Sequence, residues 1–282
     1  MTIGLHDQSV IITGASSGIG RALALRLADQ GAWVALAARD ASRLEQVAEQ
    51  CRSRGGRALV VPTDVSNESQ CQNLVQRAVA EFGRLDMLIN NAGYTATGLL
   101  EELPDLKLFQ HVMQVNFYGQ VYCTYYALSH LKETKGRLVS VSSLGGKMAI
   151  PYNTPYCSSK YGLHGFYDAL RIELARKQVS VTVICPWWVA TEFHERSVDQ
   201  HGVPRGEKAQ GIYNDKTMTA DQCARVVLNS AWKRKREVLM GPGPLGVWLK
   251  LISPGLVDWL VFKVFLEPAS RRVRDARSKA SE

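Results

Sequence analysis

Tyr156 and Lys160 are the residues whose types and spacing best suit acid–base chemistry. They stand four positions apart within residues 155–177, a stretch predicted to be helical, so their side chains share one helix face. A phenol titrates near pH ~10, too high for proton exchange at neutrality, but a nearby ammonium favours the phenolate and lowers that pKa. The pair predicts a tyrosine general acid or base, although such pairs also occur in helices without any catalytic role.

A glycine-rich turn near the start of the chain predicts a phosphate-binding site. The sequence TGASSGIG, residues 13–20, lies between a β-branched run, Ser9–Thr13, and a helical stretch, Arg21–Gln30. Glycines allow close backbone approach to a pyrophosphate, and the helix N-terminus adds N–H donors and partial positive charge. The residues expected to bind a dinucleotide here are Gly14, Ser16, Ser17, Gly18, Ile19 and Gly20.

The residue after the second predicted strand, Trp33–Ala38, indicates which dinucleotide binds. An NAD site places a carboxylate there for the ribose 2′-hydroxyl, whereas this chain has Ala38 followed by Arg39. A guanidinium favours a 2′-phosphate, so the sequence predicts NADP(H) as cofactor. In the alternative interpretation, Arg39 is a solvated surface residue and Asp40 binds the ribose. Asp64 and Val65, after the third strand, are expected beside the adenine.

Six predicted strands alternate with helices. This alternation predicts right-handed βαβ crossovers and an α/β Rossmann fold, a doubly wound parallel sheet with helices on both faces and ligands at the carboxyl ends of its strands. Ser66 is the expected N-cap of the third helix. The strands are 9–13, 33–38, 58–62, 85–90, 137–142 and 179–185, and the helices are 21–30, 41–54, 68–82, 106–131 and 155–177.

Several short motifs together closely resemble the short-chain dehydrogenase/reductase family. Ser143 lies thirteen residues before Tyr156, just past the fifth strand. Order and spacing match the family over residues 8–191, and SSLGGK at 142–147 with the extended C-terminal part is similar to the hydroxysteroid dehydrogenase branch. The matching pieces are TGASSGIG at 13–20, NNAG at 90–93, VN at 115–116, VSS at 141–143, YCSSK at 156–160 and the stretch Pro186 to Thr191.

The resemblance implies roles for individual residues. Tyr156 would be the general acid/base, Lys160 would lower its pKa and hold the nicotinamide ribose, and Ser143, rather than Ser142, would hydrogen-bond the substrate oxygen. Asn116 would anchor a water in a proton relay. Where the family usually has Pro-Gly, this chain has Pro186-Trp187, which puts the local contact with nicotinamide in doubt. Further cofactor contacts would come from Asn91, Ala92, Gly93, Pro186, Val189 and Thr191, with Asn90 steadying the strand end.

The expected substrate is a lipophilic ketone or alcohol of steroid, retinoid or fatty-acyl type. Residues 192–217 are polar and rich in turn formers, as in a lid. The sequence thus predicts an NADP(H)-dependent carbonyl/alcohol oxidoreductase; the alternatives are a 3-oxoacyl-carrier-protein reductase and a non-catalytic NADP-binding sensor or scaffold. The candidate substrate walls are Tyr94, Thr95, Leu144, Met148, Ile150, Tyr152, Trp187 and Trp188, together with the lid.

Composition excludes several other classes of protein. The 282 residues are 46% hydrophobic, which excludes a disordered or disulfide-stapled chain. The net charge is +8, but residues 217–282 hold twelve Lys and Arg against six Asp and Glu, so the even basic surface of a nucleic-acid-binding protein is not expected. No signal peptide is apparent, and the six scattered cysteines predict buried thiols in a cytoplasmic protein without a metal site. The histidines show no metal or triad spacing, and His194 and His201 are expected on the lid surface.

The C-terminal part leaves three interpretations open. Residues 1–242 are expected to form one catalytic domain and 243–282 an apolar, basic extension. Leu245–Leu266 is very apolar, but Pro254-Gly255 and three charged residues argue against a transmembrane span. This segment lies in a bilayer interface at the inner face of a membrane, with Lys233–Arg236 and Arg271–Lys279 on anionic headgroups, or covers a second subunit, or completes the core. The family resemblance implies a homodimer or homotetramer.

Overall fold

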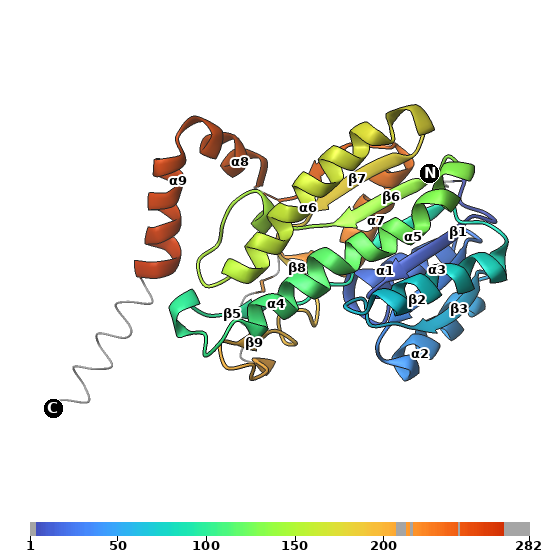
Figure 1. Cartoon of the computed structure of the whole chain (residues 1–282), viewed down its shortest axis with the longest axis horizontal. Helices are drawn as coiled ribbons and strands as arrows, with labels where there is room; N and C mark the ends of the chain where they lie inside the picture. The colour runs from blue at the N-terminus through green and yellow to red at the C-terminus, as the bar shows by residue number, and fades with distance from the viewer. Residues whose placement is uncertain (1–3, 207–212, 215–216, 242, 268–282) are drawn as a thin grey trace.

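The computed structural model describes residues 4–206, 213–214, 217–241 and 243–267. Its centre is a seven-stranded sheet in the order β11-β7-β6-β4-β1-β2-β3, with every neighbouring pair parallel (Figure 1). After β1 the chain adds β2 and β3 on one side of it, and then crosses to add β4 on the other side. This reversal creates a topological switch point between β1 and β4. The strands are β1 (Ser9–Thr13), β2 (Trp33–Ala38), β3 (Arg57–Pro62), β4 (Met87–Asn90), β6 (Arg137–Val141), β7 (Ser180–Cys185) and β11 (Glu237–Leu239).

Helices cover both faces of the sheet, as the sequence predicts. Successive strand side chains point to opposite faces, so Val10 and Ile12 pack with one helix group while Ile11 packs with the other. One face carries α1 (Gly18–Ala28), α2 (Ala41–Ser53) and α7 (Ala220–Trp232). The opposite face carries α3 (Glu68–Phe82), α5 (Gly119–Glu133) and α6 (Thr154–Glu173).

Several expected elements differ in detail. The long helix predicted over 106–131 is divided into α4 (Lys107–Met113), a π-helical turn (Gln114–Tyr118) and α5. The expected N-cap of α3, Ser66, is wrong, because Asn67 occupies that position and accepts from the Gln70 N–H. Helix α7 and the edge strand β11 were not predicted from the sequence. Strand β11 has only three residues and depends on its pairing with β7.

Two small parallel pairs organise the segments above the sheet. Strand β5 (Ala96–Thr97) pairs with β9 (Val198–Asp199), and β8 (Val189–Ala190) pairs with β10 (Met218–Thr219). The expected lid, 192–217, is therefore partly structured, although 207–212 and 215–216 lie outside the described residues. The cysteines have no disulfide partners, and all six are buried, as the sequence predicts.

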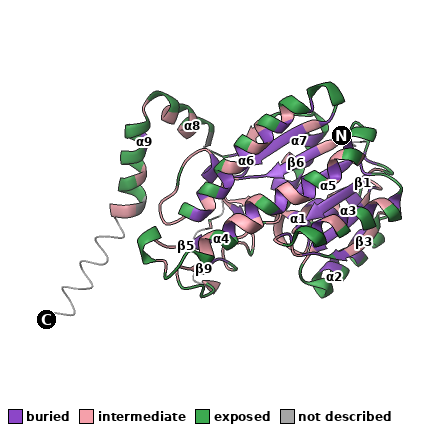
Figure 2. Ribbon diagram, in the orientation of Figure 1, coloured by how far each residue is buried: buried purple, intermediate pink, exposed green. Residues whose placement is uncertain are grey.

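The last two helices extend beyond the α/β body, and the first of them contacts α6 (Figure 1). These are α8 (Gly243–Ile252) and α9 (Pro254–Val261), followed by a π-helical turn (Phe262–Leu266). Figure 2 shows that much of their surface is exposed; Leu245 and Ile252 are 78% and 80% exposed. The expectation that Leu245–Leu266 completes the core is therefore wrong. No helix among the described residues is long and apolar enough to span a membrane.

The basic cluster expected beside this segment lies elsewhere. Arg234 donates to the carbonyls of Gln178 and Lys135, which precede β7 and β6. Lys233–Arg236 is thus at the amino end of the sheet, whereas α8 follows β11 at its carboxyl end. The other expected flank, 271–279, lies outside the described residues.

Gly20 is a position where the fold demands glycine. A Cβ atom there would lie 2.1 Å from the Gly14 carbonyl oxygen, because α1 begins directly beneath the turn. We expect Gly20→Ala to lower the free energy of unfolding by about 3 kcal/mol or more. Gly165→Ala, on the exposed side of α6 with nothing within 4 Å of the new Cβ, should instead raise it by about 1 kcal/mol. Urea titrations followed by circular dichroism measure both, and equal stability of the two variants would contradict this account.

Candidate active site

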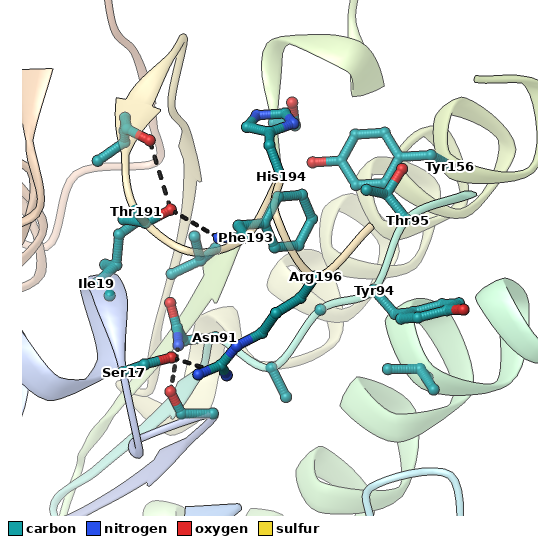
Figure 3. A pocket seen from close by; sticks show the side chains of 18 of the residues that line it. Ser17, Ile19, Asn91, Tyr94, Thr95, Tyr156, Thr191, Phe193, His194 and Arg196 are labelled. Atoms are coloured by element: carbon teal, nitrogen blue, oxygen red, sulfur yellow. Dashed lines mark hydrogen bonds between the residues drawn. The ribbon is translucent and has the colours of Figure 1, made fainter. Parts of the chain in front are cut away.

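A cavity of about 630 Å³ opens at the carboxyl ends of the strands, over the switch point between β1 and β4. This is where a doubly wound sheet binds its ligand. Most of the residues singled out from the sequence line it, and Figure 3 shows part of this lining. The expected residues found there are Gly14, Ser16, Ser17, Gly18, Ile19, Arg39, Asp64, Val65, Asn91, Ala92, Gly93, Ser143, Tyr156, Lys160, Pro186, Val189 and Thr191.

The phosphate-binding end is formed by the turn between β1 and α1. Helices α2, α3 and α7 are each capped by a side chain, but α1 begins after Ser17 without a side-chain cap or an acidic residue in its first turn. Its first N–H groups therefore face the cavity as donors for an anion. The chemistry of this end fits a dinucleotide pyrophosphate.

Asn91 and Thr13 hold the turn in place. The Asn91 side chain donates to the carbonyls of Thr13 and Gly14, at 3.0 and 3.2 Å. The Thr13 hydroxyl oxygen in turn accepts from the backbone N–H groups of Asn91 and Ala92. These bonds join the ends of β1 and β4, so Asn91 supports the cofactor turn from beneath.

Arg39, Asp40 and Asp64 lie together at the opposite end of this half of the cavity. Asp40 caps α2 by accepting from the Arg43 N–H, and this bond lowers the pKa of its carboxyl group. Burial acts to raise the pKa of Asp64, but hydrogen bonds from Ser66 and the charge of Arg39 outweigh it, so the pKa is lowered. Arg39 thus provides a cation beside carboxylates that already have partners.

Tyr156, Lys160 and Ser143 converge at the other half of the cavity. The Lys160 Nζ lies 5.5 Å from the centre of the Tyr156 ring and donates to the Val141 carbonyl at 3.1 Å. The Ser143 hydroxyl accepts from the Gly145 N–H at 3.0 Å and lies beside the Tyr156 side chain, whose pKa it acts to lower. Tyr156 and Lys160 therefore share a helix face at the end of β6, as their spacing predicts.

In the protein without a cofactor, burial is the largest influence on the pKa values of both Tyr156 and Lys160. Burial raises the pKa of Tyr156 to about 12, although the hydrogen bond from Ser143 acts in the opposite direction. Burial also lowers the pKa of Lys160 to about 8, because the ammonium is only 3% exposed. The positive nicotinamide ring of a bound cofactor would add to the charge of Lys160, so a lowered tyrosine pKa stays a prediction for the cofactor-bound protein.

Asn116 and Gly20 lie outside the cavity lining. Asn116 is fully buried in the π-helical turn, where it donates to the Tyr94 carbonyl and to Ser159 Oγ and accepts from the Tyr94 N–H. The Ser159 hydroxyl donates to the Tyr156 carbonyl. Asn116 thus links the loop after β4 to the start of α6, and its amide protons are both engaged by protein atoms.

The substrate half of the cavity is largely apolar. Six of the expected wall residues line it, whereas Met148 packs beside Gly246 of α8 and Tyr152 accepts from the Gly98 N–H outside the lining. Trp187 is not among the described residues with positive φ, so the backbone tolerates tryptophan where glycine was expected. The six are Tyr94, Thr95, Leu144, Ile150, Trp187 and Trp188.

Phe193 and His194 also line this half, in the lid that was expected to contribute to the substrate wall. His194 packs against Trp188, with ring centres 4.9 Å apart, and burial lowers its pKa to about 4. The prediction that His194 is a lid surface residue is therefore wrong, whereas His201 is exposed as expected. Only the aromatic character of neighbouring residues could have indicated this burial.

Arg196 is a further lining residue that the sequence analysis missed. Its guanidinium donates to Ser17 Oγ at 3.2 Å and to Glu192, which also accepts from Arg43 at 2.9 Å (Figure 3 shows the first contact). A lid residue therefore touches the phosphate-binding turn. Nothing in the local sequence pattern connects these positions.

A family model described as short chain dehydrogenase matches residues 8–202. The chain belongs to the short-chain dehydrogenase/reductase family. It is 41% identical to the 11-beta-hydroxysteroid dehydrogenase-like 3 of Arabidopsis thaliana, over 93% of this chain and 84% of that one. It is 33% identical to 11-beta-hydroxysteroid dehydrogenase A of Arachis hypogaea, over 96% of this chain and 79% of that one. The resemblance to the hydroxysteroid dehydrogenase branch is thereby confirmed.

Solved structures of short-chain dehydrogenase/reductase proteins share the fold. A short-chain type dehydrogenase/reductase from Mycobacterium marinum has a TM-score of 0.76 at 24% identity, covering 86% of this chain and 97% of that one. An alcohol dehydrogenase from Thermococcus sibiricus, complexed with 5-hydroxy-NADP, has a TM-score of 0.71 at 27% identity, covering 83% and 95%. The protein is therefore a Rossmann-fold oxidoreductase of the type that binds NAD(P).

Proposed function

We propose that the protein interconverts a carbonyl and an alcohol on a lipophilic, uncharged substrate with NADP(H). The observation that carries this proposal is the convergence of Tyr156, Lys160 and Ser143 on one cavity with the uncapped start of α1. One end of the cavity suits an anion and the other carries a proton donor. An NADP(H) molecule bound across it would supply the hydride.

Ser143, Tyr156 and Lys160 have different roles in the proposed reaction. Ser143 Oγ and the Tyr156 phenol donate hydrogen bonds to the substrate oxygen and stabilise negative charge that develops on it. The Tyr156 phenol gives up its proton in reduction and takes one in oxidation. Lys160, held by the Val141 carbonyl, keeps positive charge beside the phenol and lies where a cofactor ribose would pass.

The substrate wall favours an uncharged, lipophilic molecule. Its aromatic residues carry no charge, and His194 is neutral at pH 7 because its pKa is about 4. The names of the relatives support a hydroxysteroid-like substrate, with retinoid and fatty-acyl compounds as the other members of the class. The alternative reductase would bind an acidic carrier protein, but Arg43 and Arg196 beside the lid are paired with Glu192.

NADP(H) rather than NAD(H) is proposed because of Arg39. It lies at the end of β2 in the cavity lining, while the neighbouring Asp40 already accepts from Arg43 and Ser42 as the N-cap of α2. A guanidinium attracts a 2′-phosphate, and a carboxylate fixed at a helix terminus is poorly placed to reorient toward a ribose.

A membrane surface is the proposed partner of the C-terminal helices. Trp248, Trp259 and Phe262 are each more than half exposed, and Lys263 lies 4.9 Å from the Trp259 ring. Exposed aromatic residues interspersed with lysines are typical of helices that lie in a bilayer interface. Lys250 donates to Tyr161 Oη at 2.6 Å and so ties α8 to the helix that carries Tyr156. Docking of these helices would therefore place the cavity beside the bilayer, in which a lipophilic substrate is concentrated.

Turnover tests the proposed function directly. We expect loss of NADPH absorbance with at least one of a ketosteroid, retinal, an acyl ketone and a quinone. Tyr156→Phe should lower kcat by about 10²-fold or more, because the proton donor is lost, while the NADPH Kd stays unchanged. Full activity of this variant would contradict the assignment, and no turnover of any compound by the wild-type protein would favour the NADP-binding scaffold.

Cofactor preference tests the role of Arg39. We expect Arg39→Ser to weaken NADPH binding by about tenfold or more and to leave NADH binding nearly unchanged, since only NADPH carries the 2′-phosphate. Quenching of tryptophan fluorescence measures both affinities, because Trp187 and Trp188 line the cavity. Arg52→Ser is the control, since Arg52 lies on α2 but pairs with Glu45. Tighter binding of NADH than NADPH by the wild-type protein would instead favour Asp40 as a ribose ligand.

Vesicle sedimentation tests the membrane proposal. We expect the full chain to sediment with vesicles of phosphatidylcholine and phosphatidylserine, and Trp248→Glu with Trp259→Glu to lose about tenfold in affinity. Tyr125→Glu, which changes a 70% exposed aromatic residue on α5, is the control. If the full chain stays in the supernatant, the proposal is wrong. A change from dimer to monomer in the tryptophan variant would then show that a second copy covers these helices.

A further inference from the structure

The catalytic face of α6 continues one turn beyond Lys160. Tyr156, Lys160 and His164 are spaced by four residues, so all three side chains lie on the face that meets the end of β6. His164 is 8% exposed, and the sequence predicts no metal or triad arrangement for it. In the structure, polar groups contact both of its ring nitrogens.

Each of three consecutive residues at the end of β6 contacts a different member of this face. The Val141 carbonyl accepts from Lys160, Ser142 Oγ lies 3.3 Å from His164 Nε2, and the Ser143 hydroxyl lies beside Tyr156, whose pKa it acts to lower. The backbone of this tripeptide is also held to β7, since the Ser142 N–H donates to the Ile184 carbonyl. Because Ser143 follows Ser142 in the chain, a displacement of Ser142 would also move Ser143.

Glu237 fixes the far side of the imidazole. Its carboxylate lies 3.2 Å from His164 Nδ1 and 2.7 Å from Lys147 Nζ. These two partners lower the pKa of Glu237 to about 2, with the hydrogen bond from His164 as the largest cause. The charged carboxylate accepts a hydrogen bond from the Nδ1–H group, which leaves Nε2 facing Ser142 in a fixed orientation.

The space around His164 permits little movement. A Cβ atom at Gly146 would lie 2.9 Å from His164 Nε2 and 2.8 Å from the Lys160 carbonyl oxygen, so the turn after Ser143 sits directly on the ring. Cys185 Sγ lies 3.7 Å from Nε2. Burial raises the pKa of this thiol to about 12, and Lys147 already pairs with Glu237, so the cluster suits hydrogen bonding better than metal coordination.

We propose that His164 is a positioning residue for Ser143: Glu237 orients its ring, and its Nε2 holds Ser142 so that the next residue meets Tyr156. This inference rests on the proposed oxidoreductase function. It also links the edge strand β11, the last strand before the C-terminal helices, to the catalytic serine. The relay consists of three side chains, Glu237, His164 and Ser142.

Two variants of His164 separate positioning from simple packing. The amide of His164→Gln can reach the place of Nε2 and hold Ser142, whereas that of His164→Asn reaches only the place of Nδ1 and Glu237. We expect His164→Asn to lower kcat by about tenfold with the KM for NADPH unchanged, and His164→Gln to stay within about threefold of wild type. The best carbonyl substrate of the panel above is the probe, and melting temperatures report the stability of both variants.

Two further measurements respond to the position of Ser143. With NADPH deuterated at nicotinamide C4, the isotope effect on kcat should increase in His164→Asn, because the chemical step becomes slower than product release. The ¹³Cζ resonance of Tyr156, assigned with Tyr156→Phe, should shift in His164→Asn and not in His164→Gln. This signal reports the hydrogen bond to the phenol and requires no turnover.

The outcomes separate this inference from the proposed function. If both variants keep the wild-type ¹³Cζ resonance, or lose activity equally and in proportion to stability, His164 has only a packing role. If the wild-type protein reduces no carbonyl compound but the resonance shifts in His164→Asn alone, positioning holds and the proposed reaction is wrong.

Discussion

The burial of one ammonium group governs the geometry of this site. Lys160 sits on α6 with 3% of its surface exposed, and its Nζ donates to the Val141 carbonyl at the last residue of β6. A buried charge is costly unless hydrogen-bonded, so this contact fixes α6 against the strand end. Tyr156 and His164, one turn to either side, are thereby fixed as well. The low pKa of Lys160, about 8, reflects the same burial.

The order of the strands brings the remaining residues to this point. Because β1 and β4 are neighbours, the glycine turn after β1 meets Asn91 after β4, and β6 with its serines lies next along the sheet. A parallel sheet collects the carboxyl ends of its strands at one edge, although they lie far apart in the sequence. The glycine turn and the side chains after β4 and β6 therefore line one cavity.

The lid and helix α8 add contacts around the cavity that the central sheet does not provide. The lid reaches the phosphate turn through Arg196, and it contributes Phe193 and His194 to the substrate half. Helix α8 contacts the rim of the site at Lys147 and Tyr161, while its apolar residues remain exposed. The proposed substrate half of the cavity and the helices proposed to contact a membrane are thus adjoining parts of one molecule.

The sequence by itself determined the fold class, the glycine turn, and the shared face of Tyr156 and Lys160, because these follow from local periodicity and from motifs carried within single elements. It also identified most of the lining residues, since parallel strands place their carboxyl ends together. Tertiary structure alone decided the burial of His194, the contact between Arg196 and Ser17, and the chain from Glu237 through His164 to Ser142. These depend on contacts between segments far apart in the chain, whose desolvation and approach no local pattern encodes. The same holds for the pKa of Tyr156: a four-residue spacing indicates attraction between two groups, but only the packed structure decides how much water each has lost, and in the protein alone burial raises this pKa.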